Sequence, residues 1–232
     1  MQHVWADTGQ VPLIIVTVVL AGVLGGVLTH IFPRYFDNTE RPLGFDKLPV
    51  ITSWRIGAGV IAALVAWGLT FLGVRPGLLL ADICIAGGLA ASAVVDYGFH
   101  RVPWKVLAVP FIGGWVGIII DAIMTGGYLN LLWALVGMLA VAVVFHLIVK
   151  TGLGAADRNA MVAVAAVIGY YSGAMIIAWA LATYIVAGII GMFILPFAGA
   201  NKHTAKMAHV PPIAYALVLF PLYIAVGFGT WW

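Results

Sequence analysis

The chain has 232 residues, of which 64% are hydrophobic and 8% are charged, and its formal net charge is +3. This composition excludes a soluble globular domain and predicts an all-α polytopic membrane protein, with a single membrane domain over 1–232. The only cysteine, Cys84, excludes an intramolecular disulfide and a cysteine-rich zinc module. We therefore expect no metal and no other cofactor.

Long apolar runs follow one another along the chain, and a membrane-spanning helix needs about 20 mostly apolar residues. The sixth run is short, and GYYSG at 169–173 predicts a break before the seventh. We expect eight transmembrane helices, at 11–32, 56–74, 77–95, 104–121, 129–149, 159–171, 174–196 and 211–230. The longest polar stretch lies between the first two and predicts a short loop over 33–55.

The basic residues divide unevenly between the two sides of such a bundle. Ten of the eleven Lys and Arg residues lie in four alternate connections, and only Arg75 lies on the other side. These connections are 33–55, 96–105, 150–158 and 197–210. Because cytoplasmic loops are enriched in Lys and Arg, we expect the four connections in the cytoplasm and both termini on the extracytoplasmic side.

Two acidic residues, Asp96 and Asp157, lie at the expected cytoplasmic edge of the membrane. Helix capping alone can explain Asp157, which lies just before the sixth span. Asp96 ends the third span, where the helix dipole disfavours an anion unless Arg101 or Lys105 compensates. As a pair, two carboxylates at one depth can share a proton. One then activates water as general base, and the other, protonated, polarises a scissile carbonyl.

Two further acids, Asp82 and Asp121, fall near the outer ends of the third and fourth spans. Asp82 precedes Asp96 by fourteen residues, about 21 Å along a straight helix, so it cannot join the same pair. We expect Asp82 to pair with Arg75 or with water. The alternative is an ion or proton site, which intramembrane acids often mark.

The histidines predict no metal site. His203 and His209 flank a basic loop, and their spacing of six does not match a zinc pair on one helix face. His146 and Lys150 face the same side of the fifth span near its cytoplasmic end. Either side chain can tune the acid pair, while snorkelling to the membrane surface explains Lys150 equally well.

Short motifs surround the acid pair. DYGFHRVPW places Pro103 seven residues after Asp96, and GLGAADRN places Gly152 and Gly154 in a turn before Asp157. In these motifs the sequence resembles the type IV prepilin peptidases and the archaeal preflagellin peptidases, which are membrane aspartyl proteases of the GxGD type. The family also has a late proline-rich segment like VPPIAYALVLF at 210–220.

The resemblance covers 78–230, which would be a peptidase-like core. It implies that Asp96 and Asp157 are catalytic and that Pro103, Gly152, Gly154 and Arg158 position the substrate. The substrate would be a prepilin-like membrane protein whose short basic leader is removed at the cytoplasmic face of a prokaryotic inner (plasma) membrane. Apart from this substrate and the lipid bilayer, no partner such as a nucleic acid is expected, and the sequence does not specify an oligomeric state.

The chain departs from the family pattern at three positions. Ala156 replaces a Gly before the second acid, Asn159 replaces a Lys after it, and Trp104 replaces an Asn after the proline. Many bacterial members also carry a cytoplasmic zinc domain with four cysteines, associated with N-methylation of the product. With one cysteine, this chain is not expected to be an N-methyltransferase, and 33–55 would be a reduced remnant of that domain.

Two alternatives to the peptidase remain open. The first is a catalytically inactive scaffold of a pilus or secretion system, which is consistent with the changes at Ala156 and Asn159. The second is an ion-coupled transporter component that uses Asp82, together with Asp121.

Overall fold

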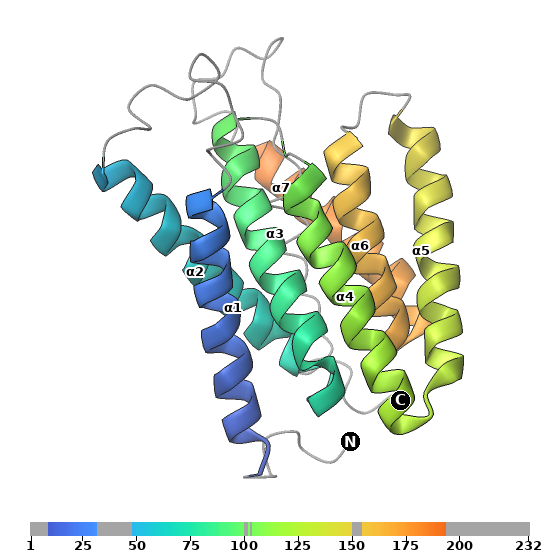
Figure 1. The fold of residues 1–232 in the computed structure, drawn as a ribbon. Helices are drawn as coiled ribbons and strands as arrows, with labels where there is room; N and C mark the ends of the chain where they lie inside the picture. The colour runs from blue at the N-terminus through green and yellow to red at the C-terminus, as the bar shows by residue number, and fades with distance from the viewer. Residues whose placement is uncertain (1–8, 32–47, 100–101, 103, 150–154, 194–232) are drawn as a thin grey trace.

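The computed structural model describes residues 9–31, 48–99, 102, 104–149 and 155–193 (Figure 1). Within these ranges the chain forms seven α-helices and one 3₁₀ turn and contains no strand, in agreement with the expected all-α class. The elements are α1 (Val11–Ile31), α2 (Leu48–Thr70), η3 (Pro76–Leu78), α3 (Leu79–Phe99), α4 (Trp104–Thr125), α5 (Tyr128–Val149), α6 (Ala155–Tyr171) and α7 (Gly173–Phe193).

Five helices, α1 to α5, are long and apolar enough to cross a membrane, which indicates a membrane protein. α6 has only 17 residues. The eighth expected span, 211–230, and both chain termini lie outside the described residues. The expected count of eight spans and the side of the termini therefore stay predictions.

The helix boundaries agree with the apolar runs at most positions. α1, α4 and α5 begin within one residue of the expected edges, and Ser172 alone separates α6 from α7, inside the expected break. The expected loop over 33–55 is wrong at its end, because α2 begins at Leu48 and residues 48–55 are helical. A helix can extend beyond the apolar layer into a polar segment, because its backbone hydrogen bonds do not depend on the polarity of the side chains.

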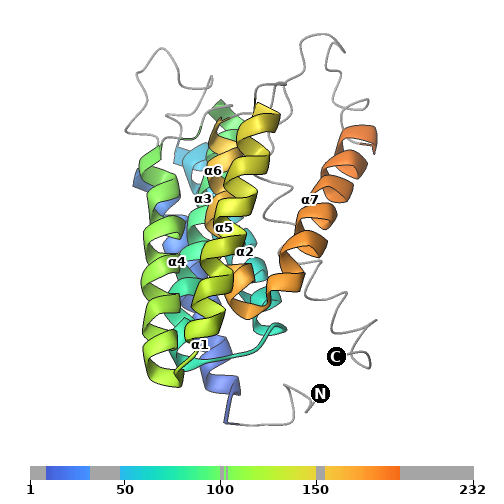
Figure 2. The ribbon, with the colours of Figure 1, turned by 90° about the vertical axis from the view of Figure 1, so that its right-hand side faces the viewer.

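α3 lies at the centre of the bundle and contacts α1, α2, α4 and α6 (Figures 1 and 2). Most of its apolar span is buried, whereas α1 and α5 expose most of theirs. α5 packs mainly on α6, and Figure 2 shows α7 sloping away from the other helices after its joint with α6. The exposed faces of α1 and α5 are apolar, as expected for helices that face lipid.

Small residues let α3 and α4 approach closely. A Cβ at Gly117 of α4 would lie 2.7 Å from Ala81 Cβ, and one at Gly77 would lie 2.6 Å from the Asp121 Cα atom. Similar close approaches recur along the two helices, and we call this contact the α3–α4 seam. It comprises the pairs Gly77–Asp121, Ala81–Gly117, Cys84–Gly113 and Gly88–Pro110. Small residues at such interfaces are typical of membrane helix packing.

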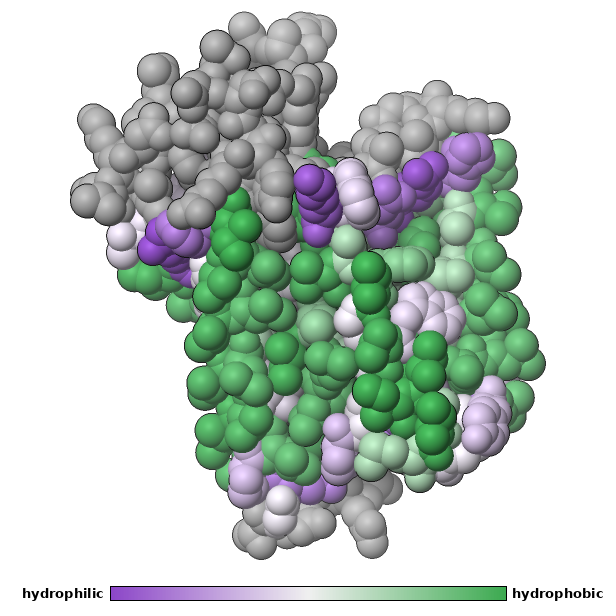
Figure 3. Space-filling view, viewed as in Figure 1, coloured by the Kyte–Doolittle hydropathy of each residue, from purple (hydrophilic) through white to green (hydrophobic). Residues whose placement is uncertain are grey.

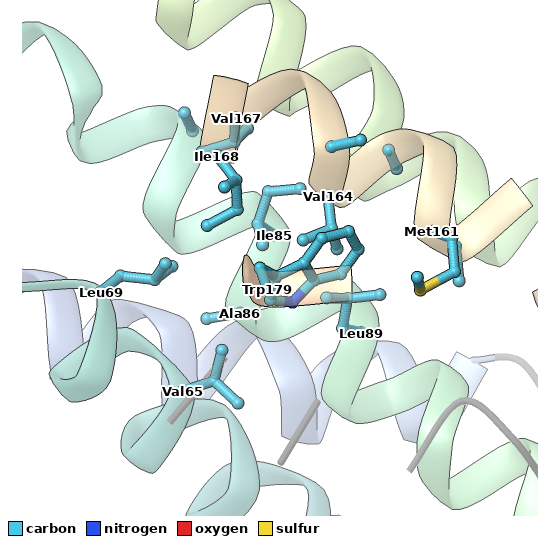
Figure 4. Packing of buried hydrophobic residues seen from close by; sticks show 14 of the residues in the cluster. Val65, Leu69, Ile85, Ala86, Leu89, Met161, Val164, Val167, Ile168 and Trp179 are labelled. Carbon is cyan, nitrogen blue, oxygen red and sulfur yellow. The ribbon is translucent and has the colours of Figure 1, made fainter. Parts of the chain in front are cut away.

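The largest side chain of the core is Trp179 of α7, which is completely buried. Its indole ring lies among Ile85 and Leu89 of α3 and Met161 and Val164 of α6 (Figure 4). Trp179 therefore anchors α7 to the bundle, although α7 diverges from it further along.

The surface view agrees with a membrane setting. In Figure 3, hydrophobic residues cover the middle of the visible face, and hydrophilic residues gather mainly at the end where α3 finishes and α4 and α6 begin. Lys105 and Arg158 belong to this end, as their positions in the first turns of α4 and α6 show.

Candidate active site

Asp96 lies in the last turn of α3, three residues before its end at Phe99. The residue is 6% exposed and follows Val95, which packs with Ala91 and Val106 in a small apolar cluster. A carboxylate in this place is removed from water and sits at the negative end of the helix dipole. Both effects oppose a structural role for Asp96 as a simple surface charge.

Asp157 is the third residue of α6, so its expected position as a cap just before the helix is wrong. The helix begins four residues before the expected edge at 159, because Ala155 and Ala156 extend it. A carboxylate in the first turn is stabilised by the helix dipole and by the unpaired backbone N–H groups there. The position suits an anion, in contrast to that of Asp96.

The fold brings the backbones of these two turns to the same end of the bundle. The carboxyl end of α3 and the amino end of α6 point the same way in Figures 1 and 2. The two helices contact each other, and α4 contacts both. The end of α3 that carries Asp96 and the end of α6 that carries Asp157 are therefore at one level, as two cooperating acids require. We call Asp96 and Asp157 the motif acid pair.

Arg158 connects the start of α6 to the end of α5. Its Nη1 atom lies 3.3 Å from Nδ1 of His146, and its Nε and Nη2 atoms donate to Oδ1 of Asn159 at 3.1 Å. His146 was expected near the acid pair, but its contact with Arg158 was not predicted. The antiparallel arrangement of α5 and α6 creates this contact across the short connection between them.

The structure describes only some of the other motif residues. Pro103, Gly152 and Gly154 lie outside the described residues. Trp104 is the first residue of α4 and is 70% exposed. Asn159 accepts both hydrogen bonds from Arg158.

A second group of polar side chains lies at the opposite end of α3. Arg75 contacts Asp121 of α4 at 3.4 Å, and Asp82 accepts a hydrogen bond from the Tyr171 hydroxyl of α6. Of the two partners expected for Asp82, Arg75 or water, Arg75 pairs with Asp121 instead, because the antiparallel packing of α3 and α4 presents Asp121 to it. Tyr170 also donates to Asp121 at 2.8 Å, and neither tyrosine was singled out from the sequence. The sequence does contain a signal for these contacts, because two adjacent tyrosines end an apolar run and a buried hydroxyl needs a hydrogen-bond partner.

No group of three or more His, Cys, Asp or Glu side chains in the described part of the chain is arranged to hold a metal ion. The chain matches no protein-family model, no curated protein and no solved structure. The site is therefore defined by its own residues and geometry.

Proposed function

We propose that the chain is a membrane aspartic endopeptidase that removes the short basic leader of prepilin-like proteins at the cytoplasmic face of a prokaryotic plasma membrane. The observation that carries the proposal is the position of the motif acid pair. Each acid lies in a family-like motif, and the helix ends that bear them share one end of the bundle. The Lys and Arg distribution assigns this same end to the cytoplasm.

The proposed chemistry needs one ionised and one protonated carboxyl group. The ionised carboxylate takes a proton from water, and the water oxygen attacks the scissile carbonyl to form a tetrahedral intermediate. The protonated carboxyl donates its hydrogen to the carbonyl oxygen. When the C–N bond breaks, the leaving nitrogen takes the proton that the first acid had removed from water. One hydroxyl of the intermediate returns its proton to the other carboxylate, which forms the product carbonyl and restores both acids. Two nearby carboxylates favour this division of roles, because like charges at short range do not both ionise readily.

The different surroundings of the two acids support unequal roles. Asp157 lies at the positive end of a helix dipole, which favours its ionised form, whereas Asp96 is buried at a negative end. On this ground Asp157 is the better candidate for the initial base and Asp96 for the initial acid. Arg158, held by His146 and Asn159, adds a fixed positive charge next to Asp157 in the sequence.

The test is a cleavage assay in cells. The chain is co-expressed with a tagged prepilin-like protein, and loss of the leader is followed by gel shift. We expect cleavage by the wild type and a loss of at least about 100-fold for Asp96→Asn and for Asp157→Asn. The matched control is Asp37→Asn, an acid on the same predicted side but outside the motifs, which should cleave normally.

The assay also decides between this function and its alternatives. Cleavage that persists after loss of either acid would refute the two-acid mechanism. A correctly inserted wild type that cleaves none of several prepilin-like substrates would favour the inactive scaffold or the ion-coupled transporter component that uses Asp82.

A further inference from the structure

A buried carboxylate cluster lies at the end of the bundle opposite the motif acid pair. We define it as Arg75, Asp82, Asp121, Tyr170 and Tyr171. Asp82 is 4% exposed and Asp121 is 1% exposed, whereas the Arg75 side chain is 39% exposed. The segment before η3 and the helices α3, α4 and α6 thus converge on two carboxyl groups that are almost fully removed from solvent.

The carboxyl group of Asp121 is only half satisfied. Its Oδ2 atom accepts from the Tyr170 hydroxyl at 2.8 Å and from Arg75 Nη1 at 3.4 Å. Its Oδ1 atom is buried and has no hydrogen-bond partner among the residues that the structure describes. That atom lies against Gly77, where a Cβ would come within 2.6 Å of it. An unpartnered buried carboxylate oxygen is costly, because water no longer solvates it.

Around Asp82, the hydrogen-bond acceptors of the cluster also outnumber the donor hydrogens. The Tyr171 hydroxyl lies 3.2 Å from each carboxyl oxygen of Asp82 and 3.4 Å from the carbonyl oxygen of Gly73. A tyrosine hydroxyl carries one hydrogen, so it can satisfy only one of these three acceptors well. A hydrogen on Asp82 would resolve the shortage, because Asp82 could then donate to Tyr171 and Tyr171 to Gly73.

The charges of the cluster also indicate that it lacks one positive charge. If both acids are ionised, Arg75 neutralises one of them, and within the described part of the chain the cluster keeps one uncompensated negative charge. Asp82 and Asp121 lie on facing turns of the α3–α4 seam, where Gly77 contacts Asp121 and Ala81 contacts Gly117, so their charges repel each other. α2 supplies no compensation, since its only basic residue, Arg55, lies near its other end. One unpaired buried charge is strongly unfavourable.

We propose that the buried carboxylate cluster binds one additional positive charge, either a proton or a small monovalent cation. A divalent metal is not favoured, because the described residues offer no group of three acidic or imidazole ligands. The partly exposed Arg75 marks the side from which the charge enters, which is opposite the motif acid pair. The proposal does not depend on the peptidase function, and its test needs no peptidase substrate.

The test uses thermal unfolding of the purified full-length protein in detergent, for the wild type and for Asp82→Asn. Samples span pH 5 to 9 in choline chloride, and a second series at pH 8.5 replaces choline with sodium or potassium at constant ionic strength. If a proton is bound only in the folded state, the folding equilibrium constant falls by up to about tenfold per pH unit while the folded state keeps that proton, and it levels off once the proton is lost. If a cation replaces it, sodium or potassium raises the melting temperature at pH 8.5.

We expect Asp82→Asn to remove the responses that the wild type shows, because the amide carries no charge and supplies its own hydrogens. At pH 8.5 in choline it should be at least as stable as the wild type. Asp37→Asn is the control and should respond like the wild type. Parallel pH and cation responses of the wild type and Asp82→Asn would overturn the proposal.

A second measurement keeps the test decisive if Asp82→Asn fails to fold. Infrared spectroscopy detects the carbonyl band of a protonated carboxylic acid. It is applied to the wild type and to Asp96→Asn, which lacks the protonated acid proposed for the motif acid pair, so a band that remains in Asp96→Asn reports on the cluster. We expect such a band at low pH and its loss either as the pH rises or when sodium or potassium is added. A wild type that shows neither this band nor any cation-dependent melting shift would refute the site.

Discussion

The α3–α4 seam yields a prediction with a built-in control. In the substitution Gly117→Ala, the new methyl group would lie 2.7 Å from Ala81 Cβ and 2.9 Å from Ala81 Cα. Neither atom belongs to a flexible side-chain end, so the two helices must move apart. Gly57 of α2 has no atom within 4 Å of its Cβ position, so Gly57→Ala makes the same chemical change in open space.

The expected magnitude follows from two opposing effects. Forcing an extra methyl group into a packed contact costs about 1–3 kcal/mol. Replacing Gly by Ala inside a helix contributes about 0.8–1 kcal/mol in the other direction. Because the contact at Gly117 is with backbone, we expect a net loss of about 1–2 kcal/mol for Gly117→Ala. For Gly57→Ala the same comparison gives a gain of up to about 1 kcal/mol.

Thermal unfolding in detergent measures both variants. For a chain of this size, the loss at Gly117 corresponds to a melting temperature about 2–8 °C below that of the wild type. Gly57→Ala should melt at or above the wild-type temperature. If Gly117→Ala melts no lower than Gly57→Ala, the close approach of α3 and α4 at this level is refuted.

Three further predictions concern other parts of the chain. The first tests the proposed topology with single cysteines in a Cys84→Ser background. A membrane-impermeant maleimide should label Tyr128→Cys in intact cells but Trp104→Cys only after permeabilisation, because these exposed residues lie at opposite ends of α4 and its turn to α5. The reverse labelling pattern would invert the proposed topology. Trp179→Ala should cost about 3–5 kcal/mol of stability. Trp179→Phe should cost clearly less, because the buried indole N–H has no hydrogen-bond partner among the described residues, and equal melting temperatures for the two variants would contradict this. His146→Ala should lower leader cleavage less than about fivefold, because its exposed contact with the following helix is worth at most about 1 kcal/mol, and complete loss of cleavage would assign His146 a direct role.

The helices that were predicted well are those with uninterrupted apolar runs. The expected edges of α1 and α5 agree with the structure within one residue because such runs define a span by length alone. The start of α2 at Leu48 is not predictable from hydropathy, since polar residues such as Arg55 interrupt the apolar pattern while the helix continues. The start of α6 at Ala155 was missed because small residues distinguish poorly between a turn and a helix.

Contacts between distant segments were the hardest to predict. Asp82 lies seven residues from Arg75, and this proximity in sequence suggested their pairing. The partner in the structure is Asp121, 46 residues from Arg75, because α4 runs antiparallel to α3 and ends beside its start. By contrast, the common level of the helix ends bearing the motif acid pair was predictable, because it depends only on the number of membrane crossings between them.

The short length of α6 has a consequence for the lipid environment. Its 17 residues span about 25 Å, whereas the hydrocarbon core of a typical bilayer is about 30 Å thick. The first turn of α6 contains Asp157, and its last two residues are Tyr170 and Tyr171 of the buried carboxylate cluster. If α6 crosses the membrane, as the sequence predicts, at least one of these polar ends lies below the lipid headgroups, unless the bilayer thins around the helix. Longer acyl chains would bury that end more deeply, so membrane thickness becomes a physical control on how easily water and ions reach it.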